Sequence, residues 1–211
     1  MGLKEIFEKI DGNGVLGKDE IGFLLAISDP EAVKYILKKA YEMKLRHIGK
    51  VVHFRGIVEF SNICEKDCLY CGIRKSGKSV RFMMSEDEVV SAALWAYGQD
   101  YGSVVLQSGE RSDSNFVDFV ERCLRRIKKE SGGRLAITLS VGEQTEETYR
   151  RWFEAGAHRY LLRIETSNPE LYKKLHPPDH SWEARRRCLG LLRRTGYQVG
   201  TGVMIGLPGQ T

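Results

Sequence analysis

The spacing of apolar residues changes character near residue 50. Before that point, apolar side chains recur every three or four positions, which predicts short amphipathic helices. Three such helices are marked by Leu3, Ile6, Phe7 and Ile10, by Ile21, Leu24 and Leu25, and by Val33, Ile36, Leu37 and Ala40. The third begins at Asp29-Pro30, an acidic cap followed by a proline that suits a first helical turn. We therefore expect an N-terminal helical segment over residues 1–50.

From residue 51 onward, short apolar runs alternate with helical stretches. The runs predict strands at residues 51–60, 103–107, 135–141, 160–165 and 197–205. Helix start signals stand between them: Ser85 with Glu88 as a capping box, Asn115, Asn168-Pro169, and Ser181. Such alternation is typical of parallel strands joined by crossover helices. The expected fold class is α/β, with a partial (β/α) TIM-type barrel over residues 51–211.

Polar residues and glycines gather where the expected strands end. In an α/β barrel, the carboxyl ends of the strands carry the functional site. A full barrel needs about eight strands, whereas five are predicted here. The chain stops directly after the fifth, which would leave the backbone groups of that strand unpaired. We therefore expect the sequence to lack a C-terminal part of the barrel.

Composition narrows the class of protein. The chain has 211 residues, of which 42% are hydrophobic and 29% charged, enough for a substantial core. It contains neither an apolar run of membrane-spanning length nor a secretory leader pattern, so we expect a cytoplasmic protein without membrane association. The net charge of +5 comes largely from basic runs on predicted helices. These are expected to be solvated faces or a docking surface for an acidic electron donor, and no nucleic-acid binding is expected, because no aromatic residues interleave with them.

Three of the five cysteines form the spacing CxxxCxxC at Cys64, Cys68 and Cys71, directly after the first predicted strand. Soft thiolates select iron–sulfur clusters, zinc or copper(I), and a short loop can place three of them around one centre. Cys123 and Cys188 lie in apolar helical patterns and are expected in the core. A four-iron cluster bound here would keep one iron free for a small molecule. The alternative, a structural zinc site, normally needs a fourth protein ligand.

The chain resembles the radical S-adenosylmethionine (SAM) superfamily and, within it, the HydE family of FeFe-hydrogenase maturases. The cysteine spacing indicates only the superfamily. The resemblance to HydE rests on the stretches VLQSGE at residues 105–110 and IETSNPELYKKLHP at residues 164–177, together with residues 59–64 and 206–211. It runs from the N-terminal helices to the last residue.

The resemblance implies a role for each motif. Cys64, Cys68 and Cys71 would hold a 4Fe-4S cluster, and SAM would complete the coordination of its fourth iron. Tyr70 would lie beside the adenine. Ser108, Gly109 and Glu110 match the segment that binds the methionine ammonium of SAM in the family. Gln107, which precedes them, is expected in the same cofactor site.

The resemblance also implies SAM contacts from residues far along the chain from the cysteine loop. Glu165 matches the residue that accepts hydrogen bonds from the ribose, and Arg185 the arginine that pairs with the methionine carboxylate. Met204, between Gly202 and Gly206, belongs to the strand that supports adenine. Thr138 and Ser140 face the same cavity in the family.

The implied activity is reductive cleavage of SAM to methionine and a 5'-deoxyadenosyl radical, which acts on a small-molecule or organometallic substrate during assembly of the hydrogenase cluster. Reduced ferredoxin or flavodoxin would donate the electron, and other hydrogenase maturases would be partners. HydE proteins continue past residue 211, so this chain is expected to lack part of the substrate pocket.

The sequence leaves other functions and residue roles open. The same chemistry could serve a different substrate, as in biotin synthase or methylornithine synthase, or the chain could be a non-catalytic metal-binding module. Glu165 could form only an ion pair with Arg163. Arg55 and Arg159 would be anion anchors if their side chains face the cavity, and His176 is expected to cap a helix rather than ligate a metal.

Overall fold

The computed structural model describes residues 2–210, which form two compact units with their boundary in the chain after Val52. The first unit contains the three expected helices, α1 (Leu3–Asp11), α2 (Lys18–Leu25) and α3 (Pro30–His47). Phe7 stacks on Tyr35 with ring centroids 4.1 Å apart, and ion pairs join Lys39 to Asp11 and Lys9 to Glu20. The Asp29 side chain caps α3 by accepting from the amide of Ala32, as the sequence predicts.

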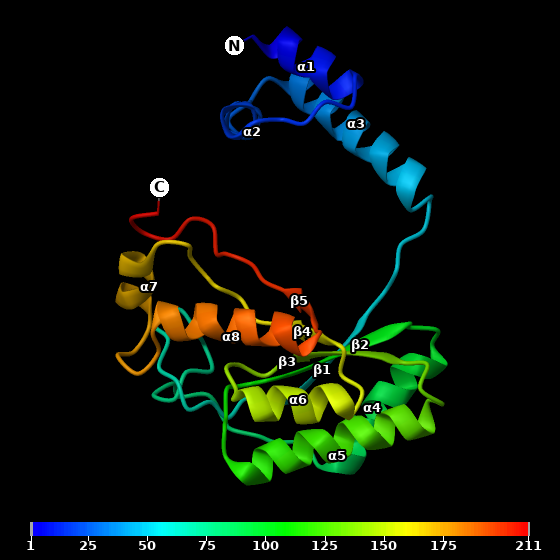
Figure 1. The fold of residues 1–211 in the computed structure, drawn as a ribbon, viewed down its shortest axis with the longest axis vertical. Helices are drawn as coiled ribbons and strands as arrows, with labels where there is room; N and C mark the ends of the chain where they lie inside the picture. The colour runs from blue at the N-terminus through cyan, green and yellow to red at the C-terminus, as the bar shows by residue number, and fades with distance from the viewer. Residues whose placement is uncertain (1, 211) are drawn as a thin grey trace. The chain divides into compact units, whose positions relative to one another are not determined.

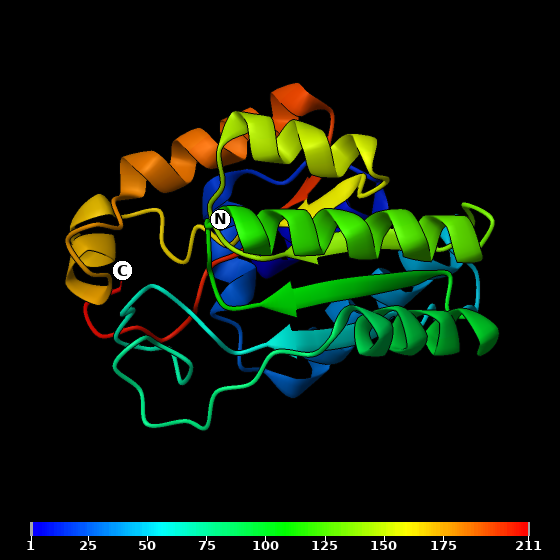
Figure 2. The ribbon, with the colours of Figure 1, turned by 90° about the horizontal axis from the view of Figure 1, so that it is seen from below.

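The second unit is built on a five-stranded parallel sheet in the order β1-β2-β3-β4-β5. Figure 2 shows β1 and β2 pointing the same way, toward the side where the loop after β1 and helix α7 lie. The strands are β1 (Gly56–Ser61), β2 (Ser103–Ser108), β3 (Ala136–Ser140), β4 (Arg159–Leu161) and β5 (Gln198–Gly200). The α/β expectation is confirmed.

Strand residues alternate between a buried face and a face that carries the polar side chains. Phe60, Leu106, Leu139 and Tyr160 are almost fully buried against the helices, as parallel strands under crossover helices require. Figure 1 shows α4, α5 and α6 beneath the sheet. The helices are α4 (Glu86–Gly98), α5 (Ser114–Glu130), α6 (Glu146–Glu154), α7 (Pro169–Leu175) and α8 (Trp182–Thr195).

Several expected boundaries are wrong. β1 begins at Gly56 rather than at residue 51, because Val51 and Val52 are exposed and outside the sheet. β4 and β5 are each three residues long, because regular pairing stops after Leu161 and Gly200 and returns only as a single parallel bridge between Glu165 and Val203. The cap of α5 is Asp113 rather than Asn115, and its carboxylate accepts from the amide of Phe116.

Helix α6 is absent from the sequence prediction. It buries Tyr149 and Trp152 on one side and is otherwise polar, with Thr145 as its cap. The three-residue spacing of the two aromatic residues was its signal, and the charged positions around them obscured it.

The N-cap of α4 gives a stability prediction. Ser85 Oγ accepts from the amide of Glu88, and the Glu88 carboxylate accepts from the amide of Ser85 at 2.7 Å. Ser85→Ala should lower the free energy of unfolding by about 1 kcal/mol in chemical denaturation, because the Glu88 amide loses its acceptor, the Ser85 hydroxyl. Ser91→Ala, on the exposed face of the same helix, is the control and should be neutral or slightly stabilising. Equal losses in both variants would contradict a capping role.

Within residues 2–210, no helix combines the length and the apolar character needed to cross a membrane.

Candidate functional site

A cavity of about 240 Å³ lies at the carboxyl ends of the strands, where the barrel argument places a site. Most of the residues expected to bind a cluster and a nucleotide line it together. The lining residues are Cys64, Cys68, Tyr70, Cys71, Ile73, Gln107, Ser108, Gly109, Glu110, Ser140, Gly142, Leu161, Leu162, Arg163, Glu165 and Arg185. Residues more than 100 positions apart in the chain therefore meet in one cavity.

The loop that carries the three cysteines is folded by its own hydrogen bonds. Asn62 anchors its start and end, because its side chain donates to the Val80 carbonyl at 2.7 Å and accepts from the Phe82 amide at 2.8 Å. The Arg81 guanidinium fills the centre and donates to the carbonyls of Asn62 and Ile73 at 2.7 and 2.8 Å. With these backbone groups satisfied, the loop holds its shape through the protein alone.

All three loop cysteines are free thiols that line the cavity. Burial raises the pKa of Cys64, and it raises that of Cys68 to about 11. Both groups are therefore protonated at neutral pH, and a metal that binds them must displace protons. Cys123 and Cys188 are buried in the core between the helices and the sheet, which confirms the expectation for them.

Gly109 brings the end of β2 against the cysteine loop. A Cβ at this position would overlap the carbonyl oxygen of Ile63 and lie 2.8 Å from Cβ of Cys64. The Gly109 amide donates to the Ser61 carbonyl at 3.1 Å, and the Glu110 carbonyl accepts from the Glu65 amide at 2.9 Å. Only glycine fits where the two backbones approach this closely.

Next to this contact, Glu110 and Arg185 form a buried acid–base pair. Arg185 Nη2 lies 3.9 Å from Glu110 Oε2, and both side chains are about nine-tenths buried, with exposed fractions of 8% and 11%. Burial raises the pKa of Glu110, partly offset by the charges of His180 and Arg185. The amide of Glu143 donates to Glu110 Oε2 at 3.0 Å. An adjacent carboxylate and guanidinium match the two ends of an amino-acid zwitterion.

Glu165 is an acceptor without a partner. It lies where β4 gives way to the next loop, in the left-handed region with a φ of 63°, which is uncommon for a residue other than glycine. Its Oε2 is buried and has no hydrogen-bond partner. Burial raises the pKa of this carboxyl, and the nearby charges of Arg163 and Arg185 act in the opposite direction. A strained residue with an unsatisfied buried acceptor is typical of a ligand site.

Tyr70 lines the cavity between two of the cysteines, and His176 holds its hydroxyl. Tyr70 Oη lies 2.8 Å from His176 Nε2, and Nδ1 of the same ring lies 2.8 Å from the Tyr172 carbonyl. Burial lowers the pKa of His176 to about 4. The ring is therefore neutral, so Nδ1–H donates to the carbonyl and Nε2 accepts from Tyr70. His176 is also the C-cap of α7, as expected.

Some expected residues lie outside this cavity. Thr138 is on the same face of β3 as Ser140, two residues earlier, and pairs with Val105 and Arg159. The Met204 amide donates to the Glu165 carbonyl at 2.9 Å, but its side chain is not among the lining groups. Arg159 donates to Gln198 rather than facing the cavity, and Arg55 is exposed before β1. Neither arginine lines the cavity, so the expectation that they are anion anchors is not supported.

Sequence reasoning missed Glu143 and His180. Glu143 Oε1 accepts from Arg185 Nε at 2.7 Å and lies 2.8 Å from His180 Nε2. Burial opposes the ionised form of Glu143, yet His180 and Arg185 outweigh it and lower the pKa of Glu143. The sequence offers only a weak signal for this pair, since His180 stands four residues after His176, which was expected to cap a helix.

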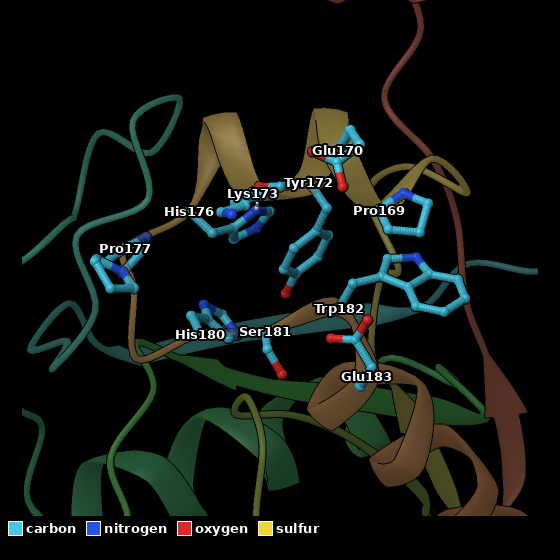
Figure 3. Close-up of a pocket in the computed structure, with 11 residues that line it drawn as sticks. Pro169, Glu170, Tyr172, Lys173, His176, Pro177, His180, Ser181, Trp182 and Glu183 are labelled. Carbon is cyan, nitrogen blue, oxygen red and sulfur yellow. Dashed lines mark hydrogen bonds between the residues drawn. The ribbon is translucent and has the colours of Figure 1, made fainter.

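His176 and His180 also border a second cavity of about 500 Å³ between α7 and the start of α8. Figure 3 shows the two rings close together below α7, with Tyr172 beside them. The Tyr172 and His176 rings are stacked with centroids 3.6 Å apart, and those of His176 and His180 are edge-to-face at 5.0 Å. This aromatic wall separates the second cavity from the cysteine loop.

Comparisons with known proteins match the chain to radical SAM proteins. The sequence profile of the radical SAM superfamily matches residues 58–211. The chain is 42% identical over 210 residues to the FeFe hydrogenase maturase subunit HydE of Thermotoga maritima, covering 99% of this chain and 58% of that protein. It is 25% identical over 210 residues to the 3-methylornithine synthase of Methanosarcina acetivorans, covering 97% of this chain and 58% of the synthase. The chain thus spans less than two thirds of the length of these relatives.

Solved structures agree on the fold. The hydrogenase maturase HydG from Carboxydothermus hydrogenoformans superposes with a TM-score of 0.86 at 23% identity, over 98% of this chain and 49% of that one. Identity this low shows the fold alone. The expected partial barrel is confirmed.

Proposed function

Because the chain belongs to the radical SAM superfamily, we propose that it holds a 4Fe-4S cluster through Cys64, Cys68 and Cys71 and binds SAM in the cavity beside them. When bound, the reduced cluster supplies the electron that cleaves SAM to methionine and a 5'-deoxyadenosyl radical. The observation that carries this proposal is the convergence of three free thiols, a zwitterion-matched ion pair and an unpartnered carboxylate on one cavity.

The donor set fits the cluster. Three thiols from one short loop suit an iron–sulfur cluster, which is bound by thiolates. A mononuclear alternative would use Cys68, His176 and His180, whose ligand atoms lie within 4.8 Å of one another. Both nitrogens of His176 are already engaged, by Tyr70 and by Tyr172. That engagement favours the thiol set over the mixed one.

The cavity also fits the methionine end of SAM. Glu110 would accept from the ammonium, and Arg185 would donate to the carboxylate. Glu143 keeps Arg185 in place by accepting a 2.7 Å hydrogen bond from Nε. Nη1 donates to the Arg163 carbonyl at 3.2 Å and Nη2 contacts His180, so each terminal nitrogen keeps a second hydrogen for a carboxylate. The two carboxylates of Glu110 and Glu143 outnumber the guanidinium of Arg185. These three buried side chains therefore favour a ligand with a net positive charge, and SAM has one because its sulfonium and ammonium outnumber its carboxylate.

The nucleoside end would meet Glu165 and Tyr70. Two ribose hydroxyls would satisfy the unpartnered carboxylate of Glu165, and the Tyr70 ring would pack beside adenine. His176 fixes the Tyr70 hydroxyl and so sets the plane of the ring. Ser108, Gln107 and Ser140 would contribute further polar contacts, with Thr138 and Met204 more remote.

For the reaction, we infer a HydE-like role in FeFe-hydrogenase maturation, supported by the 42% identity to the Thermotoga maritima protein. The substrate would be a small or organometallic precursor, the electron donor reduced ferredoxin or flavodoxin in the cytoplasm, and the partners the other hydrogenase maturases. The second candidate keeps the chemistry but uses the substrate of a methylornithine or biotin synthase, supported by 25% and 26% identity. Hydrogenase genes beside this gene would favour the first, and biotin or pyrrolysine genes the second.

Anaerobic reconstitution tests the shared chemistry. The full-length protein is loaded with iron and sulfide, reduced in the presence of SAM, and assayed for 5'-deoxyadenosine and methionine by chromatography. The proposal expects both products in equal amounts. A loaded, reduced protein that forms neither would reject the radical SAM activity.

Glu165→Gln tests the nucleoside contact. Hydrogen bonds to a charged group contribute about 1.5–3 kcal/mol each, so the Kd for SAM should rise about 10- to 100-fold in equilibrium dialysis. Glu154→Gln, exposed at the end of α6, is the control and should leave the Kd unchanged. An unchanged Kd in Glu165→Gln would contradict the ribose role.

The same variant should affect the ligand-free protein in the opposite sense. A raised pKa means that the folded state holds the proton more tightly than the unfolded chain. This contribution to stability is present at low pH and is lost as the pH rises through the folded pKa. At pH 7, Glu165→Gln should therefore raise the free energy of unfolding by about 1 kcal/mol.

A further inference from the structure

A histidine outside the cysteine motif reaches one of its sulfur atoms. His180 Nδ1 lies 3.6 Å from Cys68 Sγ, within hydrogen-bonding range for sulfur, although 112 positions separate the two residues. The His180 side chain is 1% exposed, so water does not compete for this contact.

The far end of the ring is held in place. His180 Nε2 lies 2.5 Å from Arg185 Nη2 and 2.8 Å from Glu143 Oε1, and Arg185 Nε donates to that same carboxylate oxygen at 2.7 Å. A guanidinium can only donate. A carboxylate can only accept, so the two partners of Nε2 demand opposite roles and do not fix the ring hydrogen. The assignment comes from the sulfur side, because a hydrogen bond between the ring and an iron-bound thiolate requires the hydrogen on Nδ1, the nitrogen that faces Cys68.

We propose that His180 is a positioning residue that donates a hydrogen bond from Nδ1 to the Cys68 sulfur and thereby raises the reduction potential of the bound cluster. The inference rests on the proposed function, since it concerns the same cluster. A cluster-bound thiolate offers only lone pairs, so it accepts the hydrogen that Nδ1 carries. Hydrogen bonds to cluster sulfurs stabilise the more negative, reduced state and so shift the potential upward.

The segment around His180 is built to keep this contact. The Leu69 amide donates to the Leu175 carbonyl at 2.9 Å, and Lys66 Nζ pairs with Asp179 at 3.0 Å. Together with the hydrogen bond between Tyr70 and His176, the segment from 175 to 180 thus contacts the cysteine loop at four points, of which the His180 contact is the one that reaches a sulfur. Figure 3 shows this segment descending from α7 to His180.

Two measurements on the anaerobically loaded full-length protein, without SAM, test the proposal. The first is a redox titration followed by electron paramagnetic resonance. His180→Leu should lower the midpoint potential, because the donor is lost. His180→Asn should stay near wild type, because its amide nitrogen occupies nearly the place of Nδ1. The control His158→Leu, at an exposed position before β4, should leave the potential unchanged.

The second measurement needs no variant. Wild-type protein labelled with 15N-histidine should show a nitrogen hyperfine coupling to the reduced cluster in pulsed spectra, and His180→Asn should abolish it. A loaded wild type without this coupling, or His180→Leu with an unchanged potential, overturns the inference and leaves the proposed function standing. A wild-type protein that takes up no cluster overturns both. If His180→Leu does not fold, the coupling alone decides.

Discussion

Alanine at Cys64, Cys68 or Cys71 should eliminate the cluster and, with it, all formation of 5'-deoxyadenosine. The three thiols share one cavity and are held by a loop whose hydrogen bonds do not depend on them. The sulfur atoms of Cys64 and Cys68 take part in one weak contact each, with the Lys66 amide and with His180. Each variant should therefore keep its fold while it loses a ligand that no other cysteine among the described residues can replace. Iron and sulfide analysis after anaerobic loading, together with circular dichroism, checks both halves of this expectation.

Cys123→Ala is the matched control for these variants. Cys123 is buried on α5 among apolar side chains, remote from the cavity lining. Its loss should cost about 1 kcal/mol of stability and leave the iron content per folded molecule at the wild-type level. Full cluster content in any one of the three loop variants would refute the assignment of that cysteine.

Gly109→Ala should have the next largest effect. Its added methyl group would overlap the Ile63 carbonyl and press on Cys64, so either β2 or the cysteine loop must move. Overpacking of this kind costs about 1–3 kcal/mol. A displacement of about 1 Å at a reacting centre can reduce the rate about 100-fold. We expect 5'-deoxyadenosine formation to fall by about that factor, with a weaker Kd for SAM.

The opposite end of the same strand supplies the control. Gly102 directly precedes β2, and a Cβ there would meet no atom within 4 Å. Gly102→Ala should leave cluster content and turnover near wild type. Equal losses in the two glycine variants would show that β2 is sensitive to any substitution, rather than that Gly109 is needed for close approach.

The elements with regular apolar spacing could be predicted from the sequence. Helix α5 is an example, because Phe116, Val120, Cys123 and Ile127 repeat on one buried face. Strand ends could not be predicted, since they depend on where a neighbour stops pairing. The stretch after Leu161 alternates apolar and charged residues, which is typical of a strand, but its pairing is interrupted and resumes only as an isolated bridge between Glu165 and Val203.

The residues of the candidate site likewise divide into those that the sequence could predict and those that it could not. Cys64, Cys68 and Cys71 are close in sequence, so their spacing alone indicates a common centre. Glu143 and His180 act through contacts that span 37 and 112 positions, and no local pattern encodes such a pairing. Thr138 shows the converse limit, because it lies only two residues before Ser140 on the same face of β3 and yet outside the cavity that Ser140 lines.

The order of the strands along the sheet has a consequence for biosynthesis. Each strand pairs with the one made just before it, so a chain leaving the ribosome can extend the sheet without waiting for later segments. The cysteine loop is translated early, yet its contacts with Leu175, Asp179 and His180 require chain made more than 100 residues later. We therefore expect nascent polypeptides that end before α7 to fold their first βαβ units but to be poor acceptors of iron and sulfide.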